Sequence, residues 1–225
     1  MDLSPLFISL KVAFTATFIT IFAGIAAARY VLKIKRFKGL IDGLFTLPMV
    51  LPPTVVGFFL LLLLGKNSVI GKFLVMFNIN VVFTWVGAVI ASTVVSFPLM
   101  YRTVLGAFEQ FDINIVYAAR TLGIKESKIF WTIVIPNVVP SLIAGTILTF
   151  ARALGEFGAT MMLAGNIPGR TQTMSVAVYS AVQSGDTKTA YSWVFAVCVM
   201  SFTAMALMNF WNGRQTGKSL KGGEF

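Results

Sequence analysis

The sequence offers few side chains that could do covalent chemistry. Its 225 residues include no histidine and a single cysteine. A hydrolase or acyltransferase working inside an apolar segment would need a histidine, an aspartate pair or a serine–lysine arrangement there, and the apolar segments hold none. We therefore expect no catalytic site, no metal site and no cofactor bound by the chain itself.

One pair of ionisable residues interrupts a long apolar segment. Arg152 and Glu156 lie four positions apart, so they would share one face of a helix and could pair. Ionisable side chains at membrane depth are costly, and they usually face a bundle interior or a wet cavity. Two hypotheses stay open: the pair belongs to a solute pathway or gate, or it is a neutralised structural pair that holds helices together. We favour the structural pair.

The elements that position this pair are expected to be membrane helices. Hydrophobic residues make up 57% of the chain and charged residues 12%, with a mean hydropathy of +0.85, whereas a soluble domain carries about a quarter charged residues. A helix needs roughly 20 apolar residues to cross the hydrocarbon core. Five apolar runs predict an all-α, polytopic membrane helix bundle in a single domain, 1–225: residues 6–30, 40–64, 81–101, 136–165 and 191–211.

Two of these runs are irregular. The second contains Pro48, Pro52 and Pro53, and proline removes a backbone donor and clashes with the preceding turn. The result is either a packing kink or a stretch that lines a pathway, and splitting this run would make six spans. The fourth run would be about 45 Å long if straight, so we expect it to tilt, overhang or break, with the break between Gly155 and Gly158.

The basic residues lie at the ends of the apolar runs, which indicates a topology signal and not a nucleic-acid surface. The net charge is +10, and segments 29–38, 102–128 and 214–221 together carry twelve lysines and arginines. Because loops rich in these residues stay in the cytoplasm, we expect the N-terminus outside and the C-terminus in the cytoplasm. The other side carries only five: Lys11, Lys66, Lys72, Arg170 and Lys188.

The segment 102–135 is long and amphipathic and lies between two spans, so we expect it in the cytoplasm. Apolar residues recur at helical spacing up to Leu122, and Gly123 suits a helix C-cap, after which a second helix would follow. Small side chains at Ala118 and Ala119 would let another surface approach closely. The segment is therefore typical of a docking elbow, and an amphipathic loop lying on the membrane is the alternative.

The same segment resembles the EAA loop of ABC importer permeases. The alanines and the glycine of that motif are retained at the family's spacing, whereas a tyrosine replaces its glutamate and an isoleucine replaces its leucine. The resemblance implies that this loop docks on an ATPase subunit as a coupling helix. The residues that carry the resemblance are Tyr117, Ala118, Ala119, Gly123, Ile133, Ile135 and Pro136.

The resemblance extends over nearly the whole chain and becomes more specific. Residues 47–58, 96–102, 118–123 and 150–169 resemble the molybdate permease subunit of ABC importers. Sulfate permeases are similar in the EAA loop and in the GEFGA stretch, but they are usually longer. We therefore expect a molybdate permease, with tungstate inseparable from molybdate at this level, and a sulfate or thiosulfate permease as the alternative.

This family implies a type I ABC importer-like fold and a set of partners. Two copies of the permease would form a homodimeric pore, two ABC ATPase subunits would hydrolyse ATP, and a periplasmic or lipid-anchored binding protein would deliver the oxyanion. The assembly would lie in the cytoplasmic membrane of a bacterium or archaeon and work by alternating access. The chain itself would be no enzyme, since it has no G-x-x-x-x-G-K-[ST] phosphate loop. A structural membrane protein without transport is the alternative from another class, and the EAA spacing argues against it.

Helix N-termini, backbone amides and hydroxyls could hold such an oxyanion. A tight fixed site would slow its release, so we expect specificity to lie mainly in the binding protein. Arg152 would attract the anion if its pair with Glu156 were functional. Candidate pathway or gate residues are Pro52, Pro53, Thr54, Ser96, Thr149, Arg152, Gly155, Glu156, Gly158 and Thr160, with further hydroxyls at Ser92 and Thr93.

Overall fold

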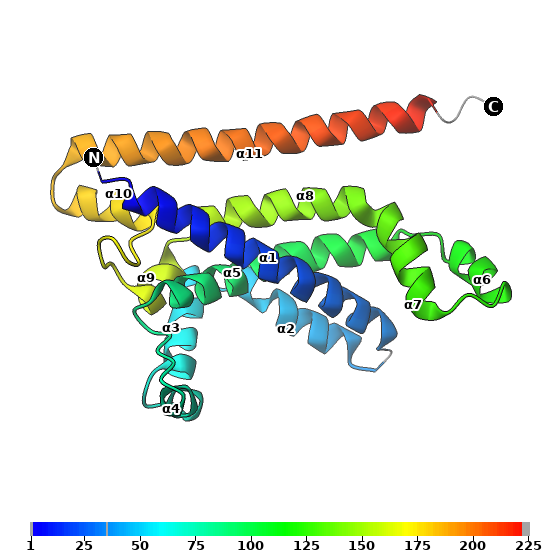
Figure 1. The fold of residues 1–225 in the computed structure, drawn as a ribbon, viewed down its shortest axis with the longest axis horizontal. Helices are drawn as coiled ribbons and strands as arrows, with labels where there is room; N and C mark the ends of the chain where they lie inside the picture. The colour runs from blue at the N-terminus through cyan, green and yellow to red at the C-terminus, as the bar shows by residue number, and fades with distance from the viewer. Residues whose placement is uncertain (1, 35, 222–225) are drawn as a thin grey trace.

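The computed structural model describes residues 2–34 and 36–221, with side chains as far as Ala206. Every regular element in this part of the chain is a helix (Figure 1). Four stretches of continuous helix are long and apolar enough to cross a membrane, and a bent pair of helices makes a fifth if it counts as one span. The predicted all-α membrane helix bundle is therefore confirmed.

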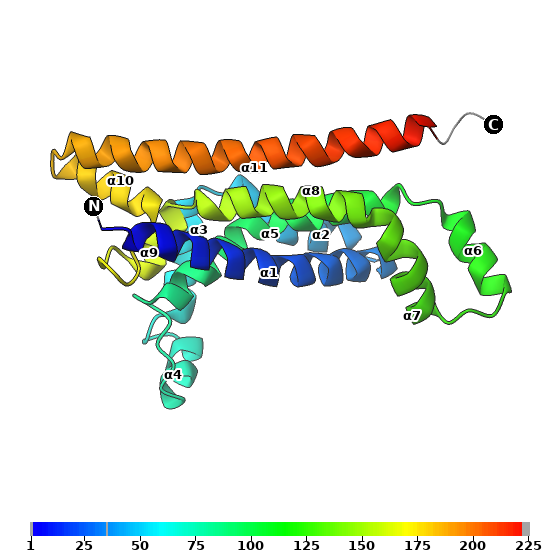
Figure 2. The same cartoon turned by 45° about the horizontal axis from the view of Figure 1, so that its top comes forward.

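The four long helices run side by side along the long axis of the molecule in Figures 1 and 2. α1 and α11 both begin at one end of the bundle, and the short helices α6 (Ile113–Thr121) and α7 (Glu126–Ile129) lie at the other. We call the latter the elbow end. The four apolar helices are α1 (Ser4–Lys33), α5 (Trp85–Glu109), the continuous helix Glu126–Leu154, which contains α8 (Ile135–Leu154), and α11 (Thr187–Lys221), apolar over Thr187–Ala206.

Small side chains let α1 pack closely in the centre of the bundle. Ala13, Ala16 and Ala28 on α1 have no exposed surface, and alanines at such positions allow helix backbones to approach each other. In contrast, Phe14 and Phe18 on the same helix are more than 60% exposed. A helix with a small-residue face inward and phenylalanines outward suits a bundle surrounded by lipid.

The second apolar run, which we expect to form one span over residues 40–64, is not one continuous helix. The run forms α2 (Lys38–Val50) and α3 (Pro53–Leu64), bent by 112° at their junction. Leu51 and Pro52 have extended backbones, with ψ of 143° and 135°. A residue before proline is forced out of the helical region, and the double proline imposes this twice. α3 and the unforeseen α4 (Val69–Met76) therefore leave the bundle to one side, as both views show.

The predicted loop 102–135 begins inside a helix. α5 continues past residue 101 to Glu109, because Val104, Leu105 and Phe108 are buried against α1 and the start of α8. The single amphipathic helix expected up to Leu122 is thus wrong. Two helices share that pattern, with a break at residues 110–112.

The helix formed by the fourth apolar run starts earlier than predicted and ends at the predicted break near Gly155. It begins at Glu126 and not at residue 136, and it passes through a π-helical turn at Phe130–Val134 before α8. Pro136 lies two residues after that turn, and the wider turn relieves the clash that proline would cause with the carbonyl four residues back. α8 ends at Leu154, and α9 (Gly158–Ala164) follows. α10 (Met174–Gln183) was not foreseen.

Candidate functional site

The turn between α6 and α7 is a compact helix stop built on one glycine. Gly123 has a φ of +73°, as its position after Leu122 predicts. Its amide donates to the carbonyl of Arg120 at 2.9 Å, and the amide of Ile124 donates to that of Ala119 at 3.2 Å. These two bonds form the Schellman motif. A φ of this sign suits glycine, because the Cβ of any other residue would come too close to the following carbonyl oxygen.

The inner face of the elbow is a small hydrophobic cluster. Val116 and Ala119 from α6 pack against Ile129 from α7, and Ile124 and Ile133 flank them. Ala119 is only 4% exposed. The expectation that Ala118 and Ala119 together present an open surface is therefore wrong for Ala119. Its position three residues after Val116 puts both side chains on the face that closes the elbow.

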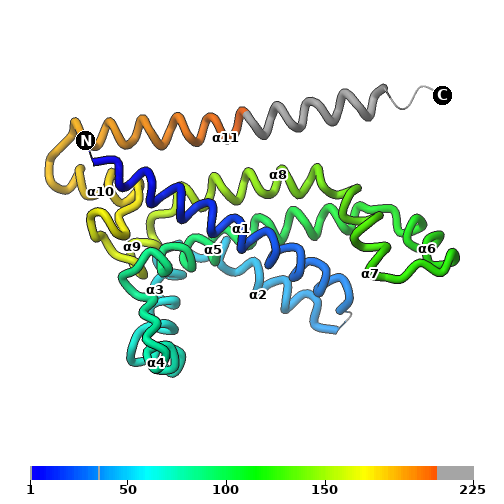
Figure 3. Tube along the Cα trace, viewed as in Figure 1, coloured from blue at the N-terminus to red at the C-terminus, as the bar shows by residue number. Residues whose placement is uncertain are grey.

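The outer face of α6 is exposed and apolar. Leu122 is 78% exposed, Tyr117 is 52% exposed and Ile113 is 51% exposed, and Ala118 is exposed beside them. We call these four residues the elbow tip. Large apolar side chains gathered on an exposed surface mark interaction sites. Figure 3 shows α6 beyond the end of the bundle, where a partner could reach it.

An ion pair spans the turn beside the elbow tip. The Nε and Nη2 atoms of Arg120 lie 2.5 and 3.1 Å from the two carboxylate oxygens of Glu126. The carboxylate raises the pKa of the Arg120 guanidinium. Both side chains are largely exposed, so the pair adds little to the stability of the fold.

The elbow is joined rigidly to the bundle through the last motif residues. Ile133 lies in the π-helical turn, and Ile135 and Pro136 open α8, so the helix from α7 to α8 is continuous. The guanidinium of Arg29 on α1 stacks on the ring of Phe130, 3.9 Å from its centroid. A displacement of the elbow would therefore be transmitted along α8.

The bend at Pro52 and Pro53 brings two candidate segments into contact. A Cβ on Gly158 would lie 3.0 Å from Cγ2 of Thr54, and a Cβ on Gly57 would lie 2.7 Å from the Cα of Ala159. The first turn of α3 thus meets the first turn of α9 without room for further atoms. Two helix N-termini, each with its positive dipole end, adjoin one another.

Arg152 and Glu156 form an ion pair across the break between α8 and α9. The Nη1 atom of Arg152 lies 2.6 Å from Oε2 of Glu156, whose side chain is 1% exposed against 34% for Arg152. The other carboxylate oxygen of Glu156 accepts from the amide of Ala159 at 2.9 Å. The pair therefore connects the last turn of α8 to the first turn of α9, an arrangement that favours the structural hypothesis. Gly155, in the break, has an ordinary φ of −86°.

The buried hydroxyls differ in how well they are satisfied. Ser96 donates to the carbonyl of Ser92 at 2.6 Å, and Thr54 is exposed. Four other candidate hydroxyls lack a hydrogen-bond partner among the described residues and are drawn from α5, α8 and α9: Ser92, Thr93, Thr149 and Thr160. A buried polar atom without a protein partner can accept water or a polar solute.

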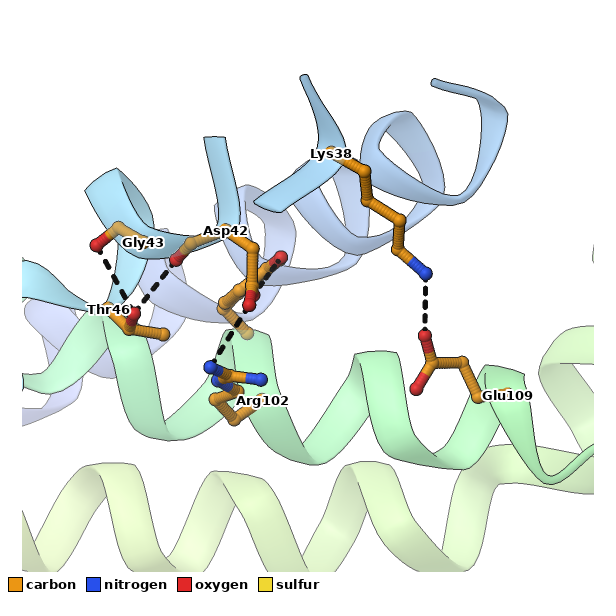
Figure 4. Close-up of polar contacts among 7 residues, drawn as sticks. Lys38, Asp42, Gly43, Thr46, Arg102 and Glu109 are labelled. Carbon is orange, nitrogen blue, oxygen red and sulfur yellow. Dashed lines mark hydrogen bonds and ion pairs between the residues drawn. The ribbon is translucent and has the colours of Figure 1, made fainter. Parts of the chain in front are cut away.

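A polar contact between α2 and α5 was missed by the sequence reasoning. Asp42 accepts from the hydroxyl of Tyr101 at 2.9 Å and lies 3.1 Å from Nη2 of Arg102, and Lys38 lies 2.9 Å from Glu109 (Figure 4). α2 has no buried residue, so these contacts are the main polar attachment of α2 to the bundle. The sequence does contain a signal for this contact, because residues of opposite charge lie at the ends of neighbouring apolar runs.

Comparison with known proteins places this geometry in a family. The family described as "Binding-protein-dependent transport system inner membrane component" matches residues 20–216. The chain is 46% identical over 201 residues to YvgM of Bacillus subtilis, a proposed molybdenum transport permease, covering 88% of each chain. It is 40% identical over 225 residues to the molybdenum transport system permease of Haemophilus influenzae, covering 98% and 97%. A sulfate transport permease of Salmonella typhimurium is 36% identical, covering 90% and 72%.

Solved structures share the fold. The inward-facing methionine ABC transporter MetNI matches with a TM-score of 0.72 at 12% identity, covering 91% of each chain. A bacterial alginate ABC transporter in complex with its alginate-bound periplasmic protein matches with a TM-score of 0.70 at 14% identity, covering 94% of this chain and 80% of that one. The expected type I ABC importer-like fold is confirmed. The chain belongs to the family of binding-protein-dependent transport system inner membrane components.

Proposed function

We propose that this chain is the membrane permease subunit of an ATP-driven importer that takes up molybdate, with tungstate as a second substrate. The observation that carries the proposal is the glycine-capped elbow, which exposes an apolar tip and is continuous with a membrane helix. The relatives named for molybdenum transport, at 40–46% identity, support molybdate as the substrate. The chain works as a transport subunit and not as an enzyme.

The elbow tip is the docking surface for a partner ATPase. Two ATPase subunits bind ATP, and their closure displaces the elbows of two copies of this chain. Because α7 continues into α8, the displacement reaches the break at Gly155, and α9 follows from Gly158. The pore between the two copies then changes from inward-facing to outward-facing. A periplasmic or lipid-anchored binding protein supplies the oxyanion to the outward-facing state.

The charge distribution supports an elbow end in the cytoplasm. Lysines and arginines are concentrated at that end, which favours the cytoplasmic side. The N-terminus is then outside, and the protein lies in a bacterial or archaeal cytoplasmic membrane. Of the twelve basic residues on this side, Lys35 and the side chains of Arg214, Lys218 and Lys221 lie outside the described residues.

The oxyanion pathway passes near the junction of α3 and α9. Groups without a net charge would attract a tetrahedral dianion weakly here. They are the N-terminal dipoles of α3 at Pro53 and of α9 at Gly158, and the hydroxyls that lack a hydrogen-bond partner among the described residues: Ser92, Thr93, Thr149 and Thr160. Thr54 and Ser96 complete the polar lining. Because a weakly held oxyanion is released quickly, the pathway can conduct it, and the binding protein provides the selectivity. Arg152 is neutralised by Glu156 and has a structural role.

Reconstitution tests the proposal. The full chain is purified with its ATPase, placed in liposomes, and supplied with binding protein loaded with molybdate, tungstate or sulfate. We expect molybdate-loaded and tungstate-loaded binding protein to stimulate ATP hydrolysis and oxyanion uptake. If only sulfate-loaded binding protein stimulated ATP hydrolysis and uptake, the chain would be a sulfate permease. This is the second candidate function, and the 36% identical relative favours it. If no loaded binding protein changed the rate of ATP hydrolysis, the importer function would be excluded.

A variant pair tests the docking surface separately. Leu122→Glu puts a charge on the exposed elbow tip without entering the inner cluster, so the permease should remain abundant and no longer co-purify with the ATPase. Lys72→Glu, a change at another exposed residue on α4 away from the elbow, should co-purify normally. Co-purification of the Leu122 variant at wild-type yield would refute the docking assignment.

A further inference from the structure

A pocket of about 410 Å³ lies at the end of the bundle opposite the elbow. Three parts of the chain form it: the first turns of α1, the start of α5 with the residues before it, and the loop between α9 and α10. Two cations, Lys11 and Arg170, line it together with the hydroxyl-bearing Thr84 and Thr171. Neither cation has an ion-pair partner among the side chains that the structure describes.

The backbone around the pocket holds these groups in place. The amides of Arg170, Thr171 and Gln172 all donate to the carbonyl of Ile167, at 2.9 to 3.2 Å, so the loop that carries Arg170 is tightly turned. The same loop is fixed to α1, because the amide of Met174 donates to the buried hydroxyl of Ser9 at 2.8 Å. Arg170 is therefore presented from a fixed backbone.

Lys11 is oriented by an aromatic ring. Its Nζ atom lies 4.0 Å from the centroid of the Trp85 ring, which also lines the pocket. Thr171 is 1% exposed, and its hydroxyl accepts from the amide of Ile167 at 3.1 Å. Since no acceptor for its proton is present in the described residues, this hydroxyl can donate to an anion. Two cations and a hydroxyl donor make a site for a tetrahedral oxyanion.

The rest of the lining distinguishes between sources of that oxyanion. Ile8, Phe83 and Trp85 give the pocket an apolar wall next to its cations. A free inorganic anion has no apolar part to place there, whereas a phospholipid carries its phosphate next to a glycerol backbone and acyl chains. Tryptophan and lysine near a helix end are also typical of the headgroup level of a membrane.

We propose that this pocket binds the phosphate of an anionic phospholipid, with the lipid's glycerol and upper acyl chain against the apolar wall. Bound there, the lipid connects α1, α5 and the α9–α10 loop at the end of the bundle remote from the ATPase. The proposal concerns a lipid site and does not depend on the identity of the transported solute.

Lipid titration of the full-length permease in detergent tests this site. Short-chain phosphatidylglycerol and phosphatidylcholine are added separately, and bound lipid is counted by native mass spectrometry. We expect one phosphatidylglycerol to bind more tightly than phosphatidylcholine. Lys11→Gln and Arg170→Gln should each weaken it roughly fivefold, the equivalent of about 1 kcal/mol per cation near a lipid surface. Arg170→Lys should retain most of the affinity.

Controls make each outcome decisive. Lys188→Gln removes an exposed cation that does not line the pocket, so it should leave phosphatidylglycerol binding unchanged. Equal loss in the Lys188 and Arg170 variants, or no preference for phosphatidylglycerol in the wild type, would overturn the proposal. So would displacement of the lipid by inorganic phosphate at equal concentration, because the pocket would then be a free-anion site. Thermal unfolding curves identify any variant that has lost its fold.

Discussion

Gly123 has a backbone conformation that is unfavourable for most other residues, although no neighbouring atom lies where a side chain would begin. Its φ is +73°, and a Cβ added there would meet no atom within 4 Å. A substitution would therefore act only through backbone strain, which is about 1–2 kcal/mol for ordinary residues and larger for a β-branched one. Asparagine tolerates this region. The geometry of the elbow thus depends on a backbone property and not on a contact.

We expect Gly123→Val to open the turn and separate ATP hydrolysis from transport, while Gly123→Asn keeps both coupled. The measurement is the ratio of oxyanion uptake to ATP hydrolysis in liposomes, with membrane abundance as the check on folding. If the valine variant couples as well as the asparagine variant, the turn does not transmit the ATPase motion.

The Arg152–Glu156 pair has unequal members, and this gives a second prediction. Glu156 is buried and also caps α9, whereas the Arg152 side chain is 34% exposed. Arg152→Ala leaves a buried carboxylate without its cation, which costs about 3–5 kcal/mol. Arg152→Ala and Glu156→Ala should both lower abundance, and the double change should recover part of it. Normal abundance with uptake lost only in the Arg152 variants would instead make Arg152 part of the pathway.

Close packing between α3 and α9 depends on glycine. A Cβ on Gly57 would lie 2.7 Å from the Cα of Ala159 and 2.8 Å from the Cβ of Met162, so the two helices must separate to admit it. We expect Gly57→Ala to destabilise the permease by about 1–3 kcal/mol through overpacking. Gly106→Ala is the matched control, because a Cβ there meets nothing within 4 Å and alanine is a better helix former. Thermal unfolding of both variants decides: equal midpoints would contradict the tight contact.

The attachment of α2 to α5 rests on Asp42 more than on Lys38. Tyr101 is fully buried, and Asp42→Ala strands its hydroxyl at a cost of about 1–3 kcal/mol. Lys38 and Glu109 are nearly half exposed, so Lys38→Ala should cost at most about 1 kcal/mol. Adding Tyr101→Phe to Asp42→Ala should recover stability, because no unpaired hydroxyl remains. A double variant as unstable as Asp42→Ala alone would contradict this account, as measured by thermal unfolding.

Much of this arrangement follows from the sequence, and the misses have physical reasons. Apolar runs predict the long helices, and a run too long for a bilayer predicts the break after Leu154. The spacing around Gly123 predicts the elbow. The spacing of apolar residues does not show where one helix ends and the next begins, so the sequence predicts one helix where α5 and α6 are separate. The 112° bend at Pro52 was underestimated, because proline forbids a helix but does not fix the direction that follows.

At the scale of the whole molecule, one continuous helix connects the elbow to the break before α9. It starts at Glu126 in the elbow, stacks on α1 through Phe130 and ends at Leu154, where Glu156 caps α9. α9 in turn fits against α3. A push at the elbow therefore reaches the junction of α3 and α9 through the short break at residues 155–157, which the Arg152–Glu156 pair spans.

The direction of this helix in the membrane is the last prediction. Lysines and arginines at the elbow end outnumber those at the other end, and cytoplasmic loops carry that excess. Reporter fusions after Lys38 and Gln110 should therefore give a cytoplasmic signal, and fusions after Lys72 and Asp186 an external one. The Lys72 fusion is the most demanding, since the bent pair α2–α3 must cross the membrane to take α4 outside. A cytoplasmic signal after Lys72 would make the pair a re-entrant loop, and the orientation of every later helix would have to be reassigned.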